Sequence, residues 1–281
     1  QFRLIQVVQG SALMTFALNT VALWKQEARD PGRTAGPPPP PFLQSWLNYS
    51  TQRHAVRFLV AVSLGTAAFN MQDIILEPYG GAVLHLSVAA TTSLTAMLAA
   101  GALLAFGLAA RALTRGFDPC RLAAYGILVG LVAFAIVIAS APLGSPLMFR
   151  CGGAAIGFGN GLFCVGTLAA AMEREQRGAS GLALGAWGAV QAGAAGIAMA
   201  AGGALRDAVA ALADGGALGP ALTGPAVGYG FVYQLEILLL FVALAVMGPL
   251  VGVTRGDGLG DAAALGVAVH SGQQLAWVQT E

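Results

Sequence analysis

Long apolar runs that carry almost no charge are the feature of this sequence that most limits its fold. Hydrophobic residues make up 57% of the 281 positions and charged residues 10%, whereas a typical soluble domain has roughly 25% charged residues. A helix of about 20 apolar residues crosses the hydrocarbon core of a bilayer. Open sheet edges are not tolerated in lipid, so we expect an all-α membrane protein with about seven transmembrane helices. The predicted spans are Leu4–Trp24, Val56–Leu76, Val83–Ala110, Leu122–Ala141, Leu147–Met172, Leu182–Leu205 and Tyr229–Val253.

A basic, proline-rich stretch divides the chain after the first span. Residues 25–57 hold five basic side chains and the run Pro37–Pro41, which is typical of a semi-rigid linker. We expect residues 58–253 to form a six-helix bundle and residues 254–281 to form a flexible tail. The sequence starts without Met inside an apolar run, so residues 1–24 are interpreted as the last helix of a missing N-terminal half.

Positive charge predicts the orientation of the spans, because basic loops stay on the cytoplasmic side. If residues 25–57 are cytoplasmic, alternation places every basic residue on that side except Arg3, Arg150 and Arg206. The tail is then cytoplasmic as well. The apolar residues of 42–47 recur at helical spacing and predict either a short amphipathic helix at the membrane surface or a partly ordered linker.

A polar segment follows the second span and contains the most informative residues. Asp73 and Glu77 are four positions apart and are expected on one helix face. We expect Pro78 to end that helix and Gly80-Gly81 to allow a tight turn. The two carboxylates therefore indicate either a functional site or an acidic cap at the membrane boundary.

Glu236 is a second acidic residue and lies about two turns inside the last span. An ionisable side chain at that depth is expected to face the bundle interior or a polar cavity. It has either a functional role or a hydrogen bond to a neighbouring helix. His85 follows the glycine pair, where it is a candidate ligand for the Mg of a chlorophyll-type ring or an ordinary interfacial histidine.

Two stripes of small residues predict close helix packing. One stripe contains Gly153, Gly157 and Gly161, and the other contains Gly181 and Gly185. A flat glycine surface also suits a large planar ligand, and the pattern does not distinguish the two uses.

The sequence shows no constellation typical of an enzyme. It has no nucleophile–base set, phosphate-binding loop or dinucleotide fingerprint, and its three cysteines lack metal-ligand spacing. We therefore expect no catalytic residues and no resident metal. A net charge of +1 gives no indication of nucleic-acid binding.

The segment Gln72-Asp73-Ile74-Ile75-Leu76-Glu77-Pro78-Tyr79-Gly80-Gly81 resembles a motif of the PucC-type, bacteriochlorophyll-delivery family of the major facilitator superfamily. Residues 229–236 and 152–161 also resemble parts of that family. The resemblance covers residues 1–253 and maps its site onto Gln72, Asp73, Glu77, Tyr79 and Glu236. Ala82 departs from the family, where an acidic residue often follows the glycine pair.

This resemblance implies the C-terminal half of a major-facilitator-type helical bundle in the inner, intracytoplasmic photosynthetic membrane of a bacterium. It also implies an assembly factor for light-harvesting complexes that binds or delivers bacteriochlorophyll as cargo. Its expected partners are the lipid bilayer, the antenna subunits, and bacteriochlorophyll or the enzymes that make it. The alternative is a proton-coupled transporter of a small solute or pigment precursor, which embedded carboxylates favour.

Overall fold

The computed structural model describes residues 2–23, 41–52, 54–174, 181–220, 222–224 and 226–251. The chain divides into two compact units, Gln1–Gln44 and Ser45–Glu281, which are described separately. The first unit contains helix α1 (Phe2–Leu23), whose large apolar side chains Leu13, Met14 and Phe16 are exposed. About half of the predicted linker and all of the predicted tail lie outside the described residues, so these two assignments stay predictions.

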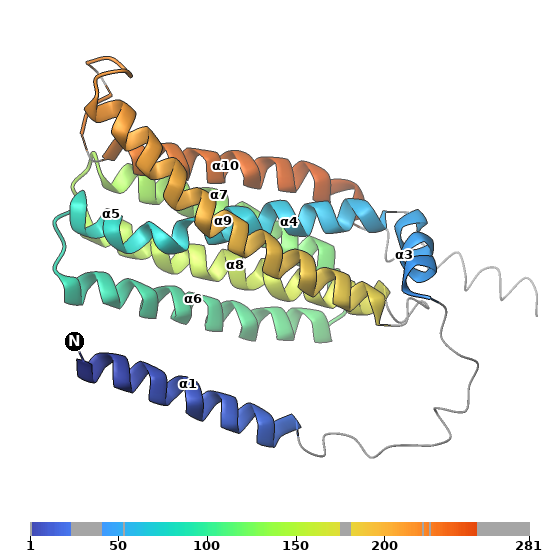
Figure 1. Cartoon of the computed structure of the whole chain (residues 1–281). Helices are drawn as coiled ribbons and strands as arrows, with labels where there is room; N and C mark the ends of the chain where they lie inside the picture. The colour runs from blue at the N-terminus through green and yellow to red at the C-terminus, as the bar shows by residue number, and fades with distance from the viewer. Residues whose placement is uncertain are drawn as a thin grey trace, which may run out of the picture. The chain divides into compact units, whose positions relative to one another are not determined.

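The second unit is a bundle of long helices joined by short turns (Figure 1). Helix α3 (Phe42–Thr51) begins just before the boundary of this unit and continues into it. The predicted short helix therefore exists, and its place at the membrane surface stays a prediction. The remaining elements are α4 (Ala55–Met71), η1 (Gln72–Ile74), α5 (Leu76–Ala82), α6 (Val88–Thr114), α7 (Pro119–Ser140), α8 (Pro146–Arg174), α9 (Leu182–Asp214), α10 (Ala226–Met247) and η3 (Gly248–Leu250).

Five helices in the described part of the chain are long and apolar enough to cross a membrane: α6, α7, α8, α9, and α10 with its η3 extension. A sixth span results if the bent pair of α3 with α4 and η1 is counted as one. The prediction of an all-α membrane protein is confirmed. The first predicted span is helical in α1, and its crossing of the membrane stays a prediction.

Helix α8 packs between α6 and α7, while α4 packs between α9 and α10. Glycines allow the α6–α8 contact: a Cβ on Gly157 would lie 2.0 Å from the Leu98 carbonyl oxygen, and one on Gly101 would lie 2.0 Å from that of Ala154. On the other side of α8, Gly159 and Gly126 of α7 are each close to the other's backbone. Small residues thus bring three helix backbones together, as expected inside a bilayer.

The helix predicted across residues 70–81 is not continuous. Helix α4 ends at Met71, one 3₁₀ turn follows, and α5 begins at Leu76. The prediction that Pro78 ends the helix is wrong, because Pro78 lies in the first turn of α5, where a missing N–H removes no intrahelical bond. Gly80 and Gly81 are inside α5 rather than in a turn. The turn comes later, where His85 adopts a positive φ of 54°.

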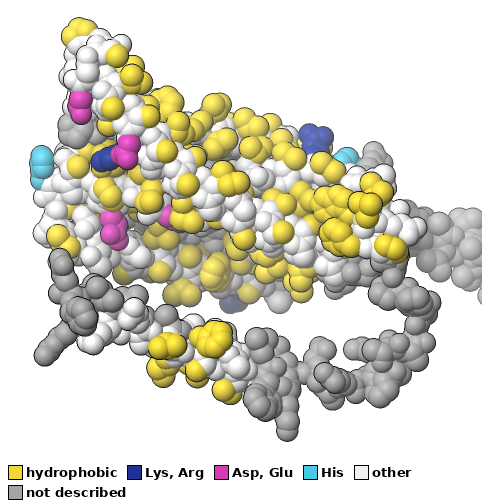
Figure 2. Space-filling model, in the orientation of Figure 1, with side chains coloured by type: hydrophobic (Ala, Val, Ile, Leu, Met, Phe, Trp, Pro, Cys, Tyr) yellow, Lys and Arg dark blue, Asp and Glu magenta, His cyan; other side chains and the backbone are white. Residues whose placement is uncertain are grey.

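Large apolar side chains cover the outside of the bundle. Figure 2 shows hydrophobic side chains of all sizes spread along the visible helices, with charged side chains mainly toward the helix ends. Leu104 is 70% exposed, and Val132, Ile197 and Phe241 are also exposed. An apolar surface this extensive is not maintained in water, and its distribution matches a protein surrounded by lipid.

We predict that Gly157→Ala destabilises the bundle by at least about 1–3 kcal/mol, because the new methyl group collides with backbone rather than with a movable side chain. Gly185→Ala is the matched control, since no described heavy atom lies within 4 Å of its Cβ position. The control should be neutral or up to about 1 kcal/mol more stable. Thermal unfolding of the two purified variants in detergent measures these changes. Equal unfolding midpoints for Gly157→Ala and Gly185→Ala would contradict the close packing at Gly157.

Candidate functional site

One face of α10 carries the polar centre of the bundle. Tyr229, Tyr233 and Glu236 follow one another at spacings of four and three residues, which places them on the same helical face. Tyr229 is 1% exposed, and both Tyr233 and Glu236 are fully buried. The prediction that Glu236 faces the bundle interior is confirmed, and its functional role stays a prediction.

Tyr79 of α5 lies at the middle of an aromatic cluster. Its ring centroid is 5.3 Å from Phe149, 5.4 Å from Tyr229 and 5.3 Å from Tyr233. The two contacts between tyrosines are edge-to-face, a geometry that contributes about 0.5–1.5 kcal/mol per pair beyond simple burial. The cluster joins α5, α8 and α10, so it holds the short helix α5 against the bundle.

Gln72 and Asp73 lie in η1, at the break between α4 and α5. The Gln72 side-chain amide donates to Oδ1 of Asp73 at 2.5 Å and to the Phe69 carbonyl at 3.4 Å. Gln72 is 1% exposed, whereas Asp73 is exposed. Asp73 is close enough to Glu236 for the two carboxyl groups to interact electrostatically. The break therefore places a second acidic residue within electrostatic range of the buried one.

Four buried polar atoms in this region have no hydrogen-bond partner among the described residues. They are Oε1 of Gln72, the hydroxyl of Tyr233 and both carboxyl oxygens of Glu236. An unpartnered buried polar group costs about 1–3 kcal/mol, and more when it is charged. We refer to Gln72, Asp73, Tyr233 and Glu236 as the oxygen cluster.

Glu77 does not join the oxygen cluster. The hydroxyl of Thr95 on α6 donates to Oε1 of Glu77 at 2.6 Å, and Glu77 is exposed. The expectation that Asp73 and Glu77 share one α-helical face is wrong, because the 3₁₀ turn and Ile75 interrupt the helix between them. A four-residue spacing aligns side chains only within an unbroken α-helix.

His85 lies exposed in the turn between α5 and α6. Its role as a pigment ligand stays a prediction. Within the described ranges, no group of three or more His, Cys, Asp or Glu side chains is arranged to hold a metal ion.

The predicted glycine stripes have different surroundings. Gly157 and Gly161 contact the backbone of α6 closely, whereas the nearest atom to a Cβ on Gly153 is a Leu76 methyl at 4.0 Å. Gly181 has a positive φ of 74° at the start of α9, which glycine adopts without strain. Around Gly185 there is open space among the described residues, so the packing predicted for it is not observed. Gly188, Gly193 and Gly196 of α9 are equally open.

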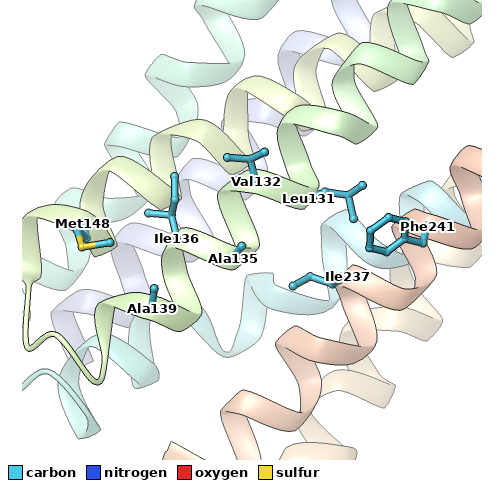
Figure 3. Close-up of a pocket in the computed structure, with 8 residues that line it drawn as sticks. All are labelled: Leu131, Val132, Ala135, Ile136, Ala139, Met148, Ile237 and Phe241. Carbon is cyan, nitrogen blue, oxygen red and sulfur yellow. The ribbon is translucent and has the colours of Figure 1, made fainter.

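An apolar groove runs between α7, α8 and α10 (Figure 3). Its volume is about 460 Å³, and it opens to the outside of the bundle. The lining contains no polar surface and consists of Leu131, Val132, Ala135, Ile136, Ala139, Met148, Ile237 and Phe241. Such a groove suits a hydrocarbon chain and offers no hydrogen bond to a polar ligand.

Three residues of this region were not predicted from the sequence: Tyr229, Tyr233 and Arg206. The guanidinium of Arg206 lies 4.5 Å from the Tyr229 ring centroid, donates to the Tyr229 hydroxyl and pairs with Asp207. The spacing of the tyrosines from Glu236 was a usable signal. No such signal pointed to Arg206, because the span was expected to end at Leu205. Helix α9 instead continues to Asp214.

Comparison with known proteins gives a family and several relatives. The family model described as "PUCC protein" matches residues 1–255. The "Uncharacterized protein in puhA-bchM intergenic region" of Rhodobacter capsulatus is 51% identical over 253 residues, which are 89% of this chain and 53% of the relative. "Protein PucC" of Rhodovulum sulfidophilum is 49% identical over 211 residues, 74% of this chain and 46% of the relative.

A more distant relative is the "Bacteriochlorophyll synthase 44.5 kDa chain" of Rhodobacter capsulatus. It is 30% identical over 195 residues, which are 67% of this chain and 45% of the relative. The chain spans about half the length of the curated relatives it matches.

We predict that Tyr229→Phe and Tyr233→Phe differ in stability although both keep the ring contacts. The Tyr229 change removes the acceptor for Arg206 and should cost about 1 kcal/mol, reduced by the partial exposure of Arg206. The Tyr233 change removes a buried hydroxyl that has no partner among the described residues, and it should be neutral or slightly stabilising. Unfolding midpoints of the two purified variants in detergent test this, and a larger loss for Tyr233→Phe would contradict it.

Proposed function

Because the chain belongs to the PUCC protein family, we propose that it acts in light-harvesting complex assembly by binding or delivering bacteriochlorophyll. The observation that carries the proposal is the family match over residues 1–255, together with a relative named as a bacteriochlorophyll synthase chain. Since the chain spans about half of its relatives, we assign this role to the whole protein in which the chain takes part.

The chemistry of the surface is consistent with such a cargo. Bacteriochlorophyll combines a large planar ring with a long hydrocarbon tail. Gly185, Gly193 and Gly196, with Ala189 and Ala192 between them, form an exposed strip of small residues on α9, and a strip of this kind allows close approach of a planar ring. The apolar groove between α7 and α10 suits a hydrocarbon tail. The α9 strip and the apolar groove each support the proposal independently of the other.

The polar residues have a supporting role in this proposal. Asp73 and Glu236 would organise their end of the bundle through hydrogen bonds or protonation. Glu77, with its bond from Thr95, would hold α5 against α6. Antenna subunits and pigment-synthesis enzymes are the proposed partners, and the inner photosynthetic membrane of a bacterium is the proposed location. We propose no catalytic residue and no enzymatic reaction for this chain.

Deleting the gene should lower the amount of antenna complex while free pigment synthesis continues, because assembly and not synthesis is impaired. Absorption spectra of membranes and of extracted pigment measure the two quantities separately. The purified protein should also carry bacteriochlorophyll absorbance. Normal antenna levels in the deletion strain would overturn the proposal.

Two glycine variants of the purified protein test where the pigment binds. Gly193→Leu places a bulky side chain on the open strip of α9, and it should lower bound pigment several-fold without loss of the folded protein. Gly107→Leu on α6 is the control, since its Cβ position is equally free of described neighbours. Equal pigment content in both variants would exclude the α9 strip as the pigment surface.

The fully buried carboxyl of Glu236 favours a second candidate function, proton-coupled transport of a small solute or pigment precursor. Ionisable side chains inside spanning helices often mark proton pathways. In proteoliposomes, a proton-driven flux should then occur and fall at least tenfold in Glu236→Gln, while Glu77→Gln retains it. Absence of flux with every pigment precursor tried would reject this candidate.

A further inference from the structure

We propose that Arg57 binds the phosphate of an anionic phospholipid at the membrane boundary, with the acyl chains of that lipid lying between α4 and α10. We refer to Arg57 and Val60 of α4, together with Val242 and Val246 of α10, as the lipid seam. The lipid seam requires neither pigment binding nor transport.

A direct contact between the two helices sets the position of Arg57. Helix α4 starts beside the end of α10 (Figure 1), and Nε of Arg57 donates to the Val246 carbonyl oxygen at 2.9 Å. That carbonyl belongs to the last turn of α10, where arginine side chains often supply the hydrogen bond that the helix itself does not. The contact holds the guanidinium at the seam through one nitrogen and leaves its two terminal nitrogens for a ligand.

No carboxylate neutralises Arg57 within the described part of the chain. Arg57 is exposed and has no ion-pair partner there, whereas Arg206 pairs with Asp207 at the opposite end of the bundle. A guanidinium presents a planar fork of N–H donors that matches the oxygens of a phosphate group. An exposed arginine without a carboxylate partner, at the end of apolar helices, therefore favours a lipid phosphate.

Apolar side chains continue the seam from Arg57 toward the middle of the bilayer. Helix α4 packs against α10, and its first turn meets the last turn of α10, so the two helices are antiparallel. One turn deeper than Arg57 on the same face of α4 is Val60, and one turn deeper than Val246 on α10 is Val242. Both valines are 42% exposed. A headgroup held by Arg57 would therefore place its acyl chains against apolar side chains of both helices.

The charge at this end of the bundle also favours an anion. Because consecutive long helices alternate in direction, α6 and α8 end here and α7 begins here. The acidic residues described at this end are Asp118 and Glu173, and the basic ones are Arg57, Arg111, Arg115, Arg121 and Arg174, with His54 at the start of α4. This is the predicted cytoplasmic side, and the cytoplasmic leaflet carries anionic lipids.

The other basic side chains are less suited to the seam. Arg174 lies over the Phe58 ring, 4.2 Å from its centroid, and donates to the Ala170 carbonyl oxygen at 3.0 Å. Arg150 lies in the second turn of α8, and its Nε is buried without a partner among the described residues. That turn is at the opposite end of the bundle, so Arg150 does not contribute to binding at Arg57.

Lipid-dependent stability of the purified full-length protein tests the proposal. Unfolding midpoints are measured in an uncharged detergent with increasing amounts of phosphatidylglycerol, phosphatidylcholine or inorganic phosphate at constant ionic strength. Phosphatidylglycerol should raise the midpoint in a saturable way, because a ligand that binds only the folded state stabilises it. Phosphatidylcholine has no net charge and inorganic phosphate has no acyl chain, so neither should reproduce this rise.

A charge-removing variant assigns the response to Arg57. Arg57→Gln should raise the half-saturating fraction of phosphatidylglycerol about fivefold, the loss expected for one basic residue at a membrane surface. The amide nitrogen of Gln occupies the same position along the side chain as Nε of Arg, so the bond to the Val246 carbonyl can be kept. Arg111→Gln is the matched control, since Arg111 is also exposed at this end, and it should respond as wild type does.

A second variant keeps the test open if Arg57→Gln does not fold. Ala245 is exposed on α10 beside Val246, so Ala245→Glu adds a carboxylate near the seam and leaves Arg57 itself unchanged. It should weaken the response to phosphatidylglycerol by at least the same factor. Ala110→Glu, beside Arg111 on α6, is its control and should respond as wild type does.

Three results would overturn the lipid seam. One is a wild-type midpoint that phosphatidylglycerol and phosphatidylcholine change equally. Another is the same response to inorganic phosphate alone, which would indicate a site for a free anion. The third is a full response in both Arg57→Gln and Ala245→Glu, which would place the bound lipid elsewhere on the protein.

Discussion

Close approach of helix backbones is the interaction on which the rest of this bundle depends. In lipid, apolar side chains gain little by leaving one apolar environment for another, so helices associate through tight van der Waals packing. Helix α8 achieves this on two sides, with Gly157 against Leu98 of α6 and Gly159 against Gly126 of α7. Such contacts fix the distance and register of three helices, and this framework positions Phe149 of α8 against Tyr79.

The interruption of α4 at Gln72–Ile75 links the framework to the polar centre. A continuous helix would carry Asp73 and Glu77 along one face and would give Tyr79 a different position. With the break, Tyr79 reaches Tyr229 and Tyr233, and Asp73 acts on Glu236. Pro78 is compatible with this arrangement because it lies in the first turn of α5, where its missing N–H removes no intrahelical bond. Aromatic rings and buried oxygens are thus arranged by the same local feature.

Several parts of the site were predictable from spacing and polarity. A carboxylate two turns inside an apolar span predicts an inward-facing Glu236, since exposure to lipid is costly. The positions of Tyr229 and Tyr233 follow from helical periodicity once Glu236 is placed. The partnership of Glu77 with Thr95 was not predictable, because it depends on how α5 crosses α6. Nor was the open surface at Gly185, since a stripe of small residues looks the same in sequence whether or not a helix covers it.

The amino-acid sequence by itself determined that the chain is helical and membrane-embedded, because twenty-residue apolar runs need lipid and lipid requires internally satisfied backbones. It also determined the membership of the PUCC family, through motifs that need no structure to be recognised. Only the tertiary structure decided where α4 breaks, which glycines carry contacts, and which oxygens lie buried without partners. These properties depend on distances between segments far apart in the chain, and local periodicity contains no information on such distances.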